Sequence, residues 1–195
     1  MSHYYTNDEV KSEMFKFNIT LLSNTLSFYS DNGVFSKRGL DYGSRFLLET
    51  FLEEKKEGKT LDVGCGYGVL GIFINKITES KVDMIDINKR AVHLSNMNIK
   101  ENNLSNIKAY YSDVYQNVLD IYKYIITNPP IRAGKDIIFK ILIDAKKHMD
   151  KSSELWFVMR KNHGLNSVLK VLENEYIVEV LKKSKGFFII KAKIA

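Results

Sequence analysis

The sequence predicts an α/β protein with a mostly parallel sheet and helices on both faces. From residue 59 onward, strand-like apolar runs alternate with helical segments, which is the chain order of parallel βα units. The last two strand-like runs follow each other across Lys185-Gly186 with no helix between them, so they should pair antiparallel. We therefore expect seven strands, the last one antiparallel. A length of 195 residues suits one domain over 1–195.

The N-terminal segment predicts a small β appendage over residues 1–40. Residues 15–21 alternate apolar and polar side chains, as a half-buried strand does. A second strand is expected through Leu26 and Phe28, and Asp31-Asn32-Gly33 is a turn signal. The core is then expected to occupy residues 41–195.

The core is predicted to begin with a helix from Asp41 to Glu54, because its apolar residues recur on one face. The βα units follow. Strands are expected at 59–63, 81–86, 107–112, 123–127, 153–159, 177–182 and 187–194, and helices near 68–77, 89–102, 135–149 and 164–174.

A glycine-rich turn follows the first core strand, in Leu61-Asp62-Val63-Gly64-Cys65-Gly66-Tyr67-Gly68. Gly64, Gly66 and Gly68 let the chain turn sharply and let a ligand approach the bare backbone. Gly66 to Gly71 also matches the dinucleotide fingerprint, with Asp86 twenty residues beyond Gly66. An NAD enzyme therefore stays an alternative on this rule alone.

Asp62 favours a different cofactor. A carboxylate beside the turn would repel a pyrophosphate, whereas it suits the ammonium and sulfonium groups of S-adenosylmethionine, directly or through water. Asp86 can accept both ribose hydroxyls, Asp113 can accept the adenine amino group, and the methionine part is expected near the start of the first core helix. Besides Asp62 and the three glycines, the predicted cofactor residues are Asp41, Ser44, Cys65, Asp86, Ile87, Asp113 and Val114.

The second motif is Asn128-Pro129-Pro130, after the fourth core strand. Proline fixes φ and lacks an N–H, so the pair holds carbonyls in fixed directions without competing donors. The Asn128 side-chain oxygen and the Pro129 carbonyl can each accept one hydrogen of a planar amine, which directs the nitrogen lone pair at a reacting group. These three residues are the predicted catalytic residues.

The two motifs together resemble S-adenosylmethionine-dependent methyltransferases of exocyclic and amide nitrogens, which share a Rossmann-like sheet. Asn-Pro-Pro-Ile-Arg-Ala-Gly-Lys over residues 128–135 is similar to the short, single-domain branch of the RsmC family. The segments 33–37, 39–45 and 159–161 are also similar to that family. The resemblance implies methylation of a guanine N2 in small-subunit ribosomal RNA.

Three other readings stay open. Adenine-N6 and protein glutamine-N5 methyltransferases share both motifs, but they usually carry an aromatic residue where this chain has Ile131. A non-catalytic RNA-binding scaffold is the third, although the acidic residues and Asn128 are intact. This chain also departs from the longer RsmC members, which carry a second methyltransferase-like half and an aromatic residue after the prolines, where this chain has Ile131.

The charge distribution indicates where RNA would bind. Residues 132–195 hold 14 Lys and Arg against 7 Asp and Glu, whereas residues 1–131 hold 15 against 16. Such an excess suits ribosomal RNA or the small ribosomal subunit, although lysines also simply solvate a surface. The predicted substrate contacts are Lys37, Arg38, Ile131, Arg132 and Lys135.

Several classes are excluded or disfavoured. No apolar run approaches the roughly 20 residues of a membrane-spanning helix, and the polar start is no signal peptide, so a cytoplasmic location is expected. The single cysteine, Cys65, cannot form an internal disulfide. The histidines form no metal motif, and we predict no metal.

Overall fold

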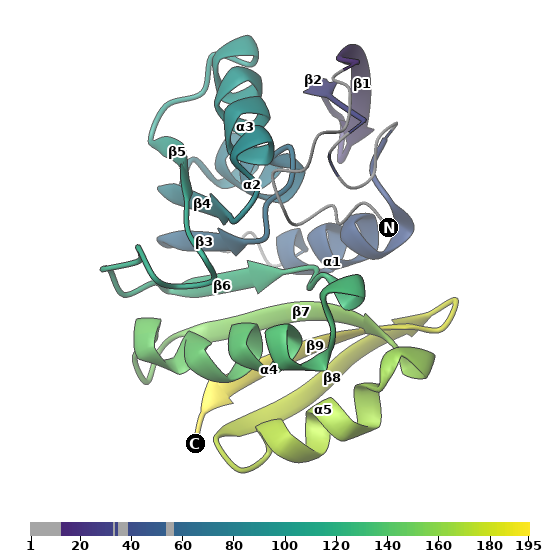
Figure 1. Cartoon of the computed structure of the whole chain (residues 1–195), viewed down its shortest axis with the longest axis vertical. Helices are drawn as coiled ribbons and strands as arrows, with labels where there is room; N and C mark the ends of the chain where they lie inside the picture. The colour runs from purple at the N-terminus through teal and green to yellow at the C-terminus, as the bar shows by residue number, and fades with distance from the viewer. Residues whose placement is uncertain (1–12, 33, 35–38, 54–56) are drawn as a thin grey trace.

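The computed structural model describes residues 13–32, 34, 39–53 and 57–195. Nine strands and five α-helices are described in this part of the chain (Figure 1). The strands are β1 (Phe15–Leu21), β2 (Asn24–Ser30), β3 (Thr60–Val63), β4 (Val82–Asp86), β5 (Ile107–Tyr111), β6 (Tyr124–Thr127), β7 (Glu154–Arg160), β8 (Tyr176–Ser184) and β9 (Phe187–Ile194). The helices are α1 (Tyr42–Leu52), α2 (Val69–Thr78), α3 (Lys89–Glu101), α4 (Lys135–Asp144) and α5 (Leu165–Leu172), with short 3-10 turns at Ile131–Ala133, Ala145–His148 and Lys161–His163.

The main sheet has seven strands in the order β5-β4-β3-β6-β7-β9-β8. The first five of these are parallel, and β9 runs antiparallel to both of its neighbours, β7 and β8. The order reverses between β3 and β6, where an open α/β sheet opens a crevice at the carboxyl ends of its strands. The predicted fold class is confirmed, including the antiparallel last strand.

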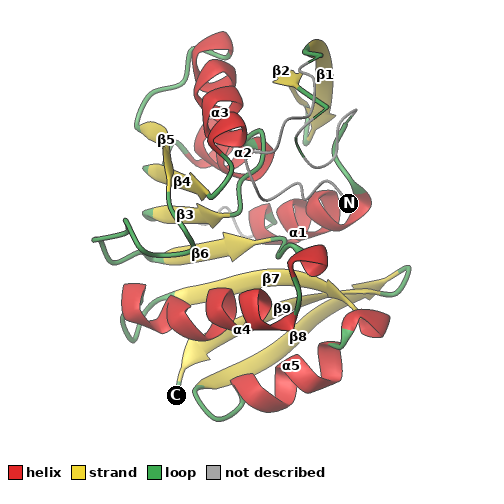
Figure 2. Ribbon diagram, viewed as in Figure 1, coloured by secondary structure: helices red, strands yellow, loops and turns green. Residues whose placement is uncertain are grey.

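Two apolar layers cover the sheet because its central strands are buried on both faces. Every residue of β3 and β6 is buried, as expected for parallel strands. One layer joins the sheet to α1, α2 and α3, and the other joins it to α4 and α5. Figure 2 shows α2 and α3 beside the β3–β5 half, and α4 and α5 beside the β7–β9 half.

The predicted N-terminal hairpin is present as a separate two-stranded sheet, in which Phe15 pairs with Ser30 and Leu21 with Asn24. It packs on α3 through two asparagine side chains one helical turn apart. Asn98 accepts from the Tyr29 N–H (2.7 Å) and donates to the Tyr29 carbonyl (3.0 Å). Asn102 does the same with Ser27, at 3.0 and 2.7 Å. These amides bond to β2 as a neighbouring strand would.

One predicted helix is wrong in length. The helix expected over 135–149 ends at Asp144 and continues as the 3-10 turn Ala145–His148. Tyrosine hydroxyls explain the change, because Tyr115 donates to the Ile141 carbonyl (2.8 Å) and Tyr176 to the Leu142 carbonyl (3.0 Å). If the α-helix continued, these two carbonyls would accept hydrogen bonds from N–H groups four residues further along the chain.

Candidate active site

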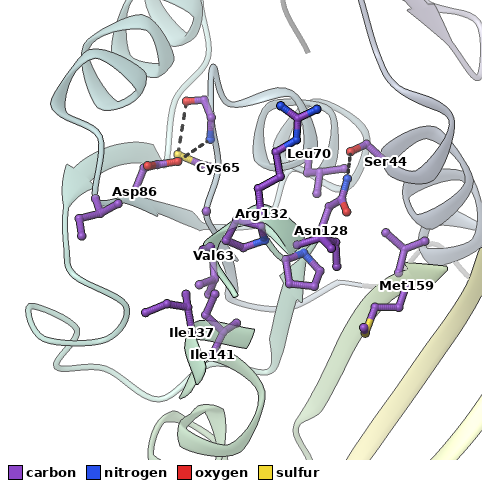
Figure 3. A pocket seen from close by; sticks show the side chains of 18 of the residues that line it. Ser44, Val63, Cys65, Leu70, Asp86, Asn128, Arg132, Ile137, Ile141 and Met159 are labelled. Carbon is purple, nitrogen blue, oxygen red and sulfur yellow. Dashed lines mark hydrogen bonds between the residues drawn. The ribbon is translucent and has the colours of Figure 1, made fainter. Parts of the chain in front are cut away.

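A cavity of about 900 Å³ opens at the carboxyl ends of β3, β4, β6 and β7. Both sequence motifs reach it, since the glycine turn follows β3 and Asn128 follows β6. Figure 3 shows Asp86 on one side of this cavity and Asn128 on the other. The predicted site residues that line it are Asp41, Ser44, Gly64, Cys65, Gly66, Asp86, Ile87, Asp113, Val114, Asn128, Pro129, Pro130, Ile131 and Arg132.

The glycine turn forms a cradle of bare backbone. Gly64 and Gly66 have φ values of 73° and 59°, which favour glycine. The Gly64 and Cys65 N–H groups both donate to the Ile85 carbonyl, at 2.9 and 3.0 Å, so the turn is tied to β4. A Cβ built on Gly64 meets no protein atom within 4 Å. This Cβ would project into the cavity. Because glycine has no side chain, a ligand has room to approach the backbone at Gly64.

Asp86 ends β4 and lies beside this cradle. One carboxylate oxygen accepts from the Gly66 N–H at 2.9 Å and the other from the Asn88 N–H at 2.8 Å. Each oxygen keeps a further lone pair for a ligand hydroxyl. Burial raises the pKa of Asp86 to about 6, against the effect of these backbone donors. The carboxylate is therefore mostly ionised at neutral pH and protonated in mild acid.

Asp62 is placed behind the turn and does not line the cavity. Its side chain is fully buried, and one oxygen accepts from the Gly71 N–H in α2 at 3.0 Å. The other oxygen has no hydrogen-bond partner, and burial raises the pKa of Asp62 to about 7. Any effect on a cationic ligand would act through the turn or a water. A direct contact, one of the two forms we expected, does not fit this position.

Another wall of the cavity is formed by the residues that follow β5. Asp113 lines the cavity, and no hydrogen bond to its carboxylate is recorded from the described residues. Val114 has a φ of 48°, a strained value for a β-branched residue. Ser112 holds it there by donating to the Val114 carbonyl at 2.7 Å. Ile87 adds a second apolar residue, so this end offers a carboxylate beside two aliphatic side chains.

Asn128 is oriented by Ser44. Its amide nitrogen donates to the Ser44 hydroxyl at 2.9 Å, which the dashed line in Figure 3 marks. Asp41 fixes the start of α1, because its side chain caps the helix by accepting from the Ser44 N–H at 3.1 Å. Because one N–H of the amide bonds to Ser44, the orientation of the amide is fixed, and its oxygen can accept from a ligand.

The prolines hold the backbone after Asn128 in an open turn. The Pro130 carbonyl accepts from the Ala133 N–H at 2.9 Å and starts the turn Ile131–Ala133. In the described part of the chain the Pro129 carbonyl accepts no hydrogen bond. The Asn128 amide oxygen and the Pro129 carbonyl are thus two acceptors without a protein donor at the same edge of the cavity.

The remaining predicted residues lie elsewhere. Gly68 caps α2 and packs against Ser95, and a Cβ there would come within 2.9 Å of the Ser95 hydroxyl. Lys135 begins α4 outside the cavity lining. Cys65 differs from these residues because it lines the cavity. It is buried, and burial raises the pKa of its thiol well above the usual range. Lys37 and Arg38 lie outside the described residues.

Several lining residues were not predicted. They come from the start of α1, from α4, and from the joined ends of β7 and β9. Motif spacing gave no signal for them, because they reach the cavity through the packing of helices and the pairing of β7 with β9. They include Tyr42, Ile137, Ile141, Met159, Arg160, His163 and Phe187.

The comparisons with known proteins agree with this geometry. The family model for the methyltransferase small domain matches residues 25–191. The chain belongs to the methyltransferase small domain family. The methyltransferase uses S-adenosylmethionine as its cofactor, and its cavity fits that group: Asp86 offers acceptors for ribose hydroxyls, and Gly64 leaves room at the backbone.

Two relatives show how much of the methyltransferase is shared. The uncharacterized protein YbxB of Bacillus subtilis (strain 168) is 43% identical over 196 residues, which cover 98% of both chains. Ribosomal RNA small subunit methyltransferase C of Vibrio parahaemolyticus is 37% identical over 193 residues, which cover 94% of this chain and 54% of that protein. The methyltransferase therefore spans about half the length of the methyltransferase C relatives it matches.

Solved structures show the same fold. The 16S rRNA N2 methyltransferase RsmC of T. thermophilus, in complex with AdoMet and guanosine, superposes with a TM-score of 0.85 at 22% identity, over 96% of this chain and 52% of that one. Ribosomal protein L11 methylase of Lactobacillus delbrueckii subsp. bulgaricus gives a TM-score of 0.66 at 17% identity, over 77% of this chain and 76% of that one.

None of the helices described is long and apolar enough to cross a bilayer. No group of three or more histidine, cysteine or acidic residues in the described part of the chain could hold a metal ion.

Proposed function

We propose that this methyltransferase methylates the exocyclic N2 of a guanine in small-subunit ribosomal RNA. The observation that carries the proposal is the Asn128 amide, whose nitrogen is bonded to Ser44 at 2.9 Å while its oxygen, at the cavity edge, has no donor among the described residues. An amide fixed in this way selects a ligand that donates, as an amine does, over one that only accepts.

The reaction follows from where the two acceptors sit. The Asn128 oxygen and the Pro129 carbonyl each accept one hydrogen of the guanine amine. Both hydrogens are then held, and the nitrogen lone pair, otherwise delocalised into the ring, is directed away from them. S-adenosylmethionine supplies an electrophilic methyl group when it is bound. The nitrogen becomes acidic only after it has been alkylated, so its proton can pass to water and no protein base is needed before attack.

Guanine in ribosomal RNA is favoured over the other amines for two reasons. The relatives of 33–37% identity that carry a function in their names are ribosomal RNA small subunit methyltransferases C. Ile131 also stands where adenine-N6 and glutamine-N5 enzymes carry an aromatic residue, and it lines the cavity here.

The test is transfer of labelled methyl from S-adenosylmethionine to small ribosomal subunits of a strain that lacks this gene. The modified nucleoside is identified by mass spectrometry, and N2-methylguanosine is expected. Asn128→Ala should abolish transfer and keep the affinity for S-adenosylhomocysteine within a few-fold. Asn174→Ala, an exposed amide after α5, is the matched control and should react as the wild type does.

Other products would contradict the proposal in defined ways. If the product is N6-methyladenosine or labelled protein glutamine, the Asn128 oxygen and the Pro129 carbonyl bind another amine and not that of guanine. Lack of transfer to both the subunits and their free RNA, with cofactor binding intact, would remove ribosomal RNA as the substrate.

A further inference from the structure

Two cations lie over aromatic rings beside the target end of the cavity. The Arg160 guanidinium carbon is 4.7 Å from the centroid of the Phe187 ring, and the Lys185 ammonium is 4.6 Å from that of Tyr42. The two rings contact each other, with centroids 5.5 Å apart. Tyr42, Arg160 and Phe187 all line the cavity that Asn128 also lines.

Backbone pairing fixes this group. Arg160 ends β7 and pairs with Phe187, the first residue of β9. The Lys161 N–H donates to the Gly186 carbonyl at 3.1 Å, which ties the β8–β9 turn to the end of β7. The Tyr42 hydroxyl donates to the Ser184 hydroxyl at 2.7 Å, which ties α1 to the same turn. Strand pairing and hydrogen bonds therefore hold the backbone that carries the two rings and the two cations.

Three other lysines of β8 and β9 are paired with carboxylates, whereas the Lys183 ammonium lies 5.3 Å from the centroid of the Phe188 ring. Lys182, Lys191 and Lys193 form ion pairs with Glu53, Glu179 and Glu154. Within the described part of the chain no ion pair is recorded for Arg160, Lys161 or Lys185. Among the described residues, the charges of Arg160, Lys161 and Lys185 are thus not balanced by carboxylates, whereas those of Lys182, Lys191 and Lys193 are.

We propose that Arg160 and Lys185, supported by Phe187 and Tyr42, bind the RNA as a single strand, contacting the nucleotides that flank the target guanine. The inference rests on the proposed function. A base whose amine reaches Asn128 has left its helix, and its neighbours lose stacking partners. Guanidinium planes and aromatic rings replace such partners, and the cations neutralise the adjoining phosphates.

The experiment measures binding and does not depend on catalysis. A labelled, unstructured RNA oligonucleotide and an RNA duplex of the same length are titrated with the protein and S-adenosylhomocysteine, at several salt concentrations. Arg160→Gln with Lys185→Gln should weaken single-strand binding at least tenfold. The slope of the logarithm of the binding constant against the logarithm of the salt concentration is negative. Its magnitude should decrease by about 1.4, because contacts to two phosphates of a single strand are lost.

A matched variant controls for net charge. Lys151→Gln with Lys170→Gln also removes two exposed cations, in the turn before β7 and on α5, away from the cavity lining and without an ion pair to the described residues. It should bind RNA as the wild type does. Phe187→Leu should lower the affinity without changing the salt slope, and Phe187→Tyr should restore it. Stabilisation by S-adenosylhomocysteine shows that each variant is folded.

The outcomes separate this inference from the proposed function. An unchanged salt slope in Arg160→Gln with Lys185→Gln, an equal loss in the control variant, or equal binding of the duplex would each overturn it, even if N2-methylguanosine is formed. Single-strand binding that depends on Arg160 and Lys185, by a protein that forms no N2-methylguanosine, would uphold this inference and reject the guanine assignment.

Discussion

The Ser44 hydroxyl accepts a hydrogen bond from the Asn128 amide nitrogen and so sets which end of that amide faces the cavity. Without this contact, the amide can rotate and present its N–H₂ group to the target amine. Two donors would then face each other. Ser44 is therefore a positioning residue, and the cofactor contact expected from the sequence stays a prediction.

We expect Ser44→Ala to lower kcat about five- to tenfold, because a hydrogen bond of this kind contributes about 1 kcal/mol. The dissociation constant for S-adenosylhomocysteine should change less than twofold. Thr50→Val is the control, since it removes a buried hydroxyl of the same helix, one that bonds to the Phe46 carbonyl away from the cavity. Equal losses in both variants would mean that Ser44 only stabilises α1.

The affinity for S-adenosylhomocysteine should fall as the pH is lowered through about 6. Burial raises the pKa of Asp86 to about 6, and only the ionised carboxylate can accept both ribose hydroxyls while it keeps its two backbone bonds. Above that pH the affinity should level off, and below it the dissociation constant should rise about tenfold per pH unit. Titration calorimetry at several pH values gives the profile. A dissociation constant that stays the same between pH 5 and 7 would show that Asp86 does not bind the ribose hydroxyls.

Asp62 shows the limit of sequence reasoning at this scale. Its place in the motif predicted a carboxylate near the cofactor, but whether the side chain would face the ligand or the helix could not be read from spacing. The Gly71 N–H in the first turn of α2 binds the carboxylate and turns it away from the cavity.

Among the elements, α3 connects the N-terminal hairpin with the glycine turn. Asn98 bonds to both polar groups of Tyr29 and also donates to the Tyr67 carbonyl at 2.8 Å, inside the glycine turn. Asn102 bonds to Ser27 in the hairpin but has no recorded bond to the glycine turn.

The two asparagines should therefore differ when they are replaced. Asn98→Ala removes the bonds of this side chain to the Tyr29 N–H, the Tyr29 carbonyl and the Tyr67 carbonyl. It should lower the free energy of unfolding by about 2 kcal/mol and Tm by about 6 °C, and it should also weaken cofactor binding. Asn102→Ala should lower Tm by less and leave cofactor binding unchanged. Thermal unfolding and calorimetry test this, and the same cofactor affinity in both variants would refute the coupling.

Most elements were predictable because their periodicity is local. The alternation in 15–21 gave β1 at the same bounds, and each core strand lies within two residues of its predicted bounds. The end of α4 was not predictable, since the tyrosines that bind its last carbonyls come from Tyr115 and Tyr176, far away in the chain. Tertiary contacts decided that boundary.

In the molecule as a whole, the site is split along the edge of the sheet. The cofactor end lies at β3, β4 and β5, and the target end at β6, β7 and β9. The first half was predictable because each of its residues directly follows a strand. Tyr42, Arg160 and Phe187 could not be predicted, because their meeting depends on β9 lying between β7 and β8.

S-adenosylhomocysteine should stabilise the whole chain against heat, and NAD should not. At a ligand concentration of about 100 times the dissociation constant, the gain is about 2.7 kcal/mol, or a rise in Tm of about 5–10 °C. Differential scanning fluorimetry with both ligands tests this. A rise with NAD and none with S-adenosylhomocysteine would favour the dinucleotide reading of the Gly66–Gly71 segment.

The position of β9 also sets an order of events during synthesis. Because β9 is inserted between two strands made before it, the sheet cannot close until residues up to Ile194 have left the ribosome. Until then β7 keeps an unpaired edge, and the cavity lacks the wall that Phe187 provides. A nascent chain that already holds the glycine turn and Asn128 thus still lacks the side of the cavity that β9 completes.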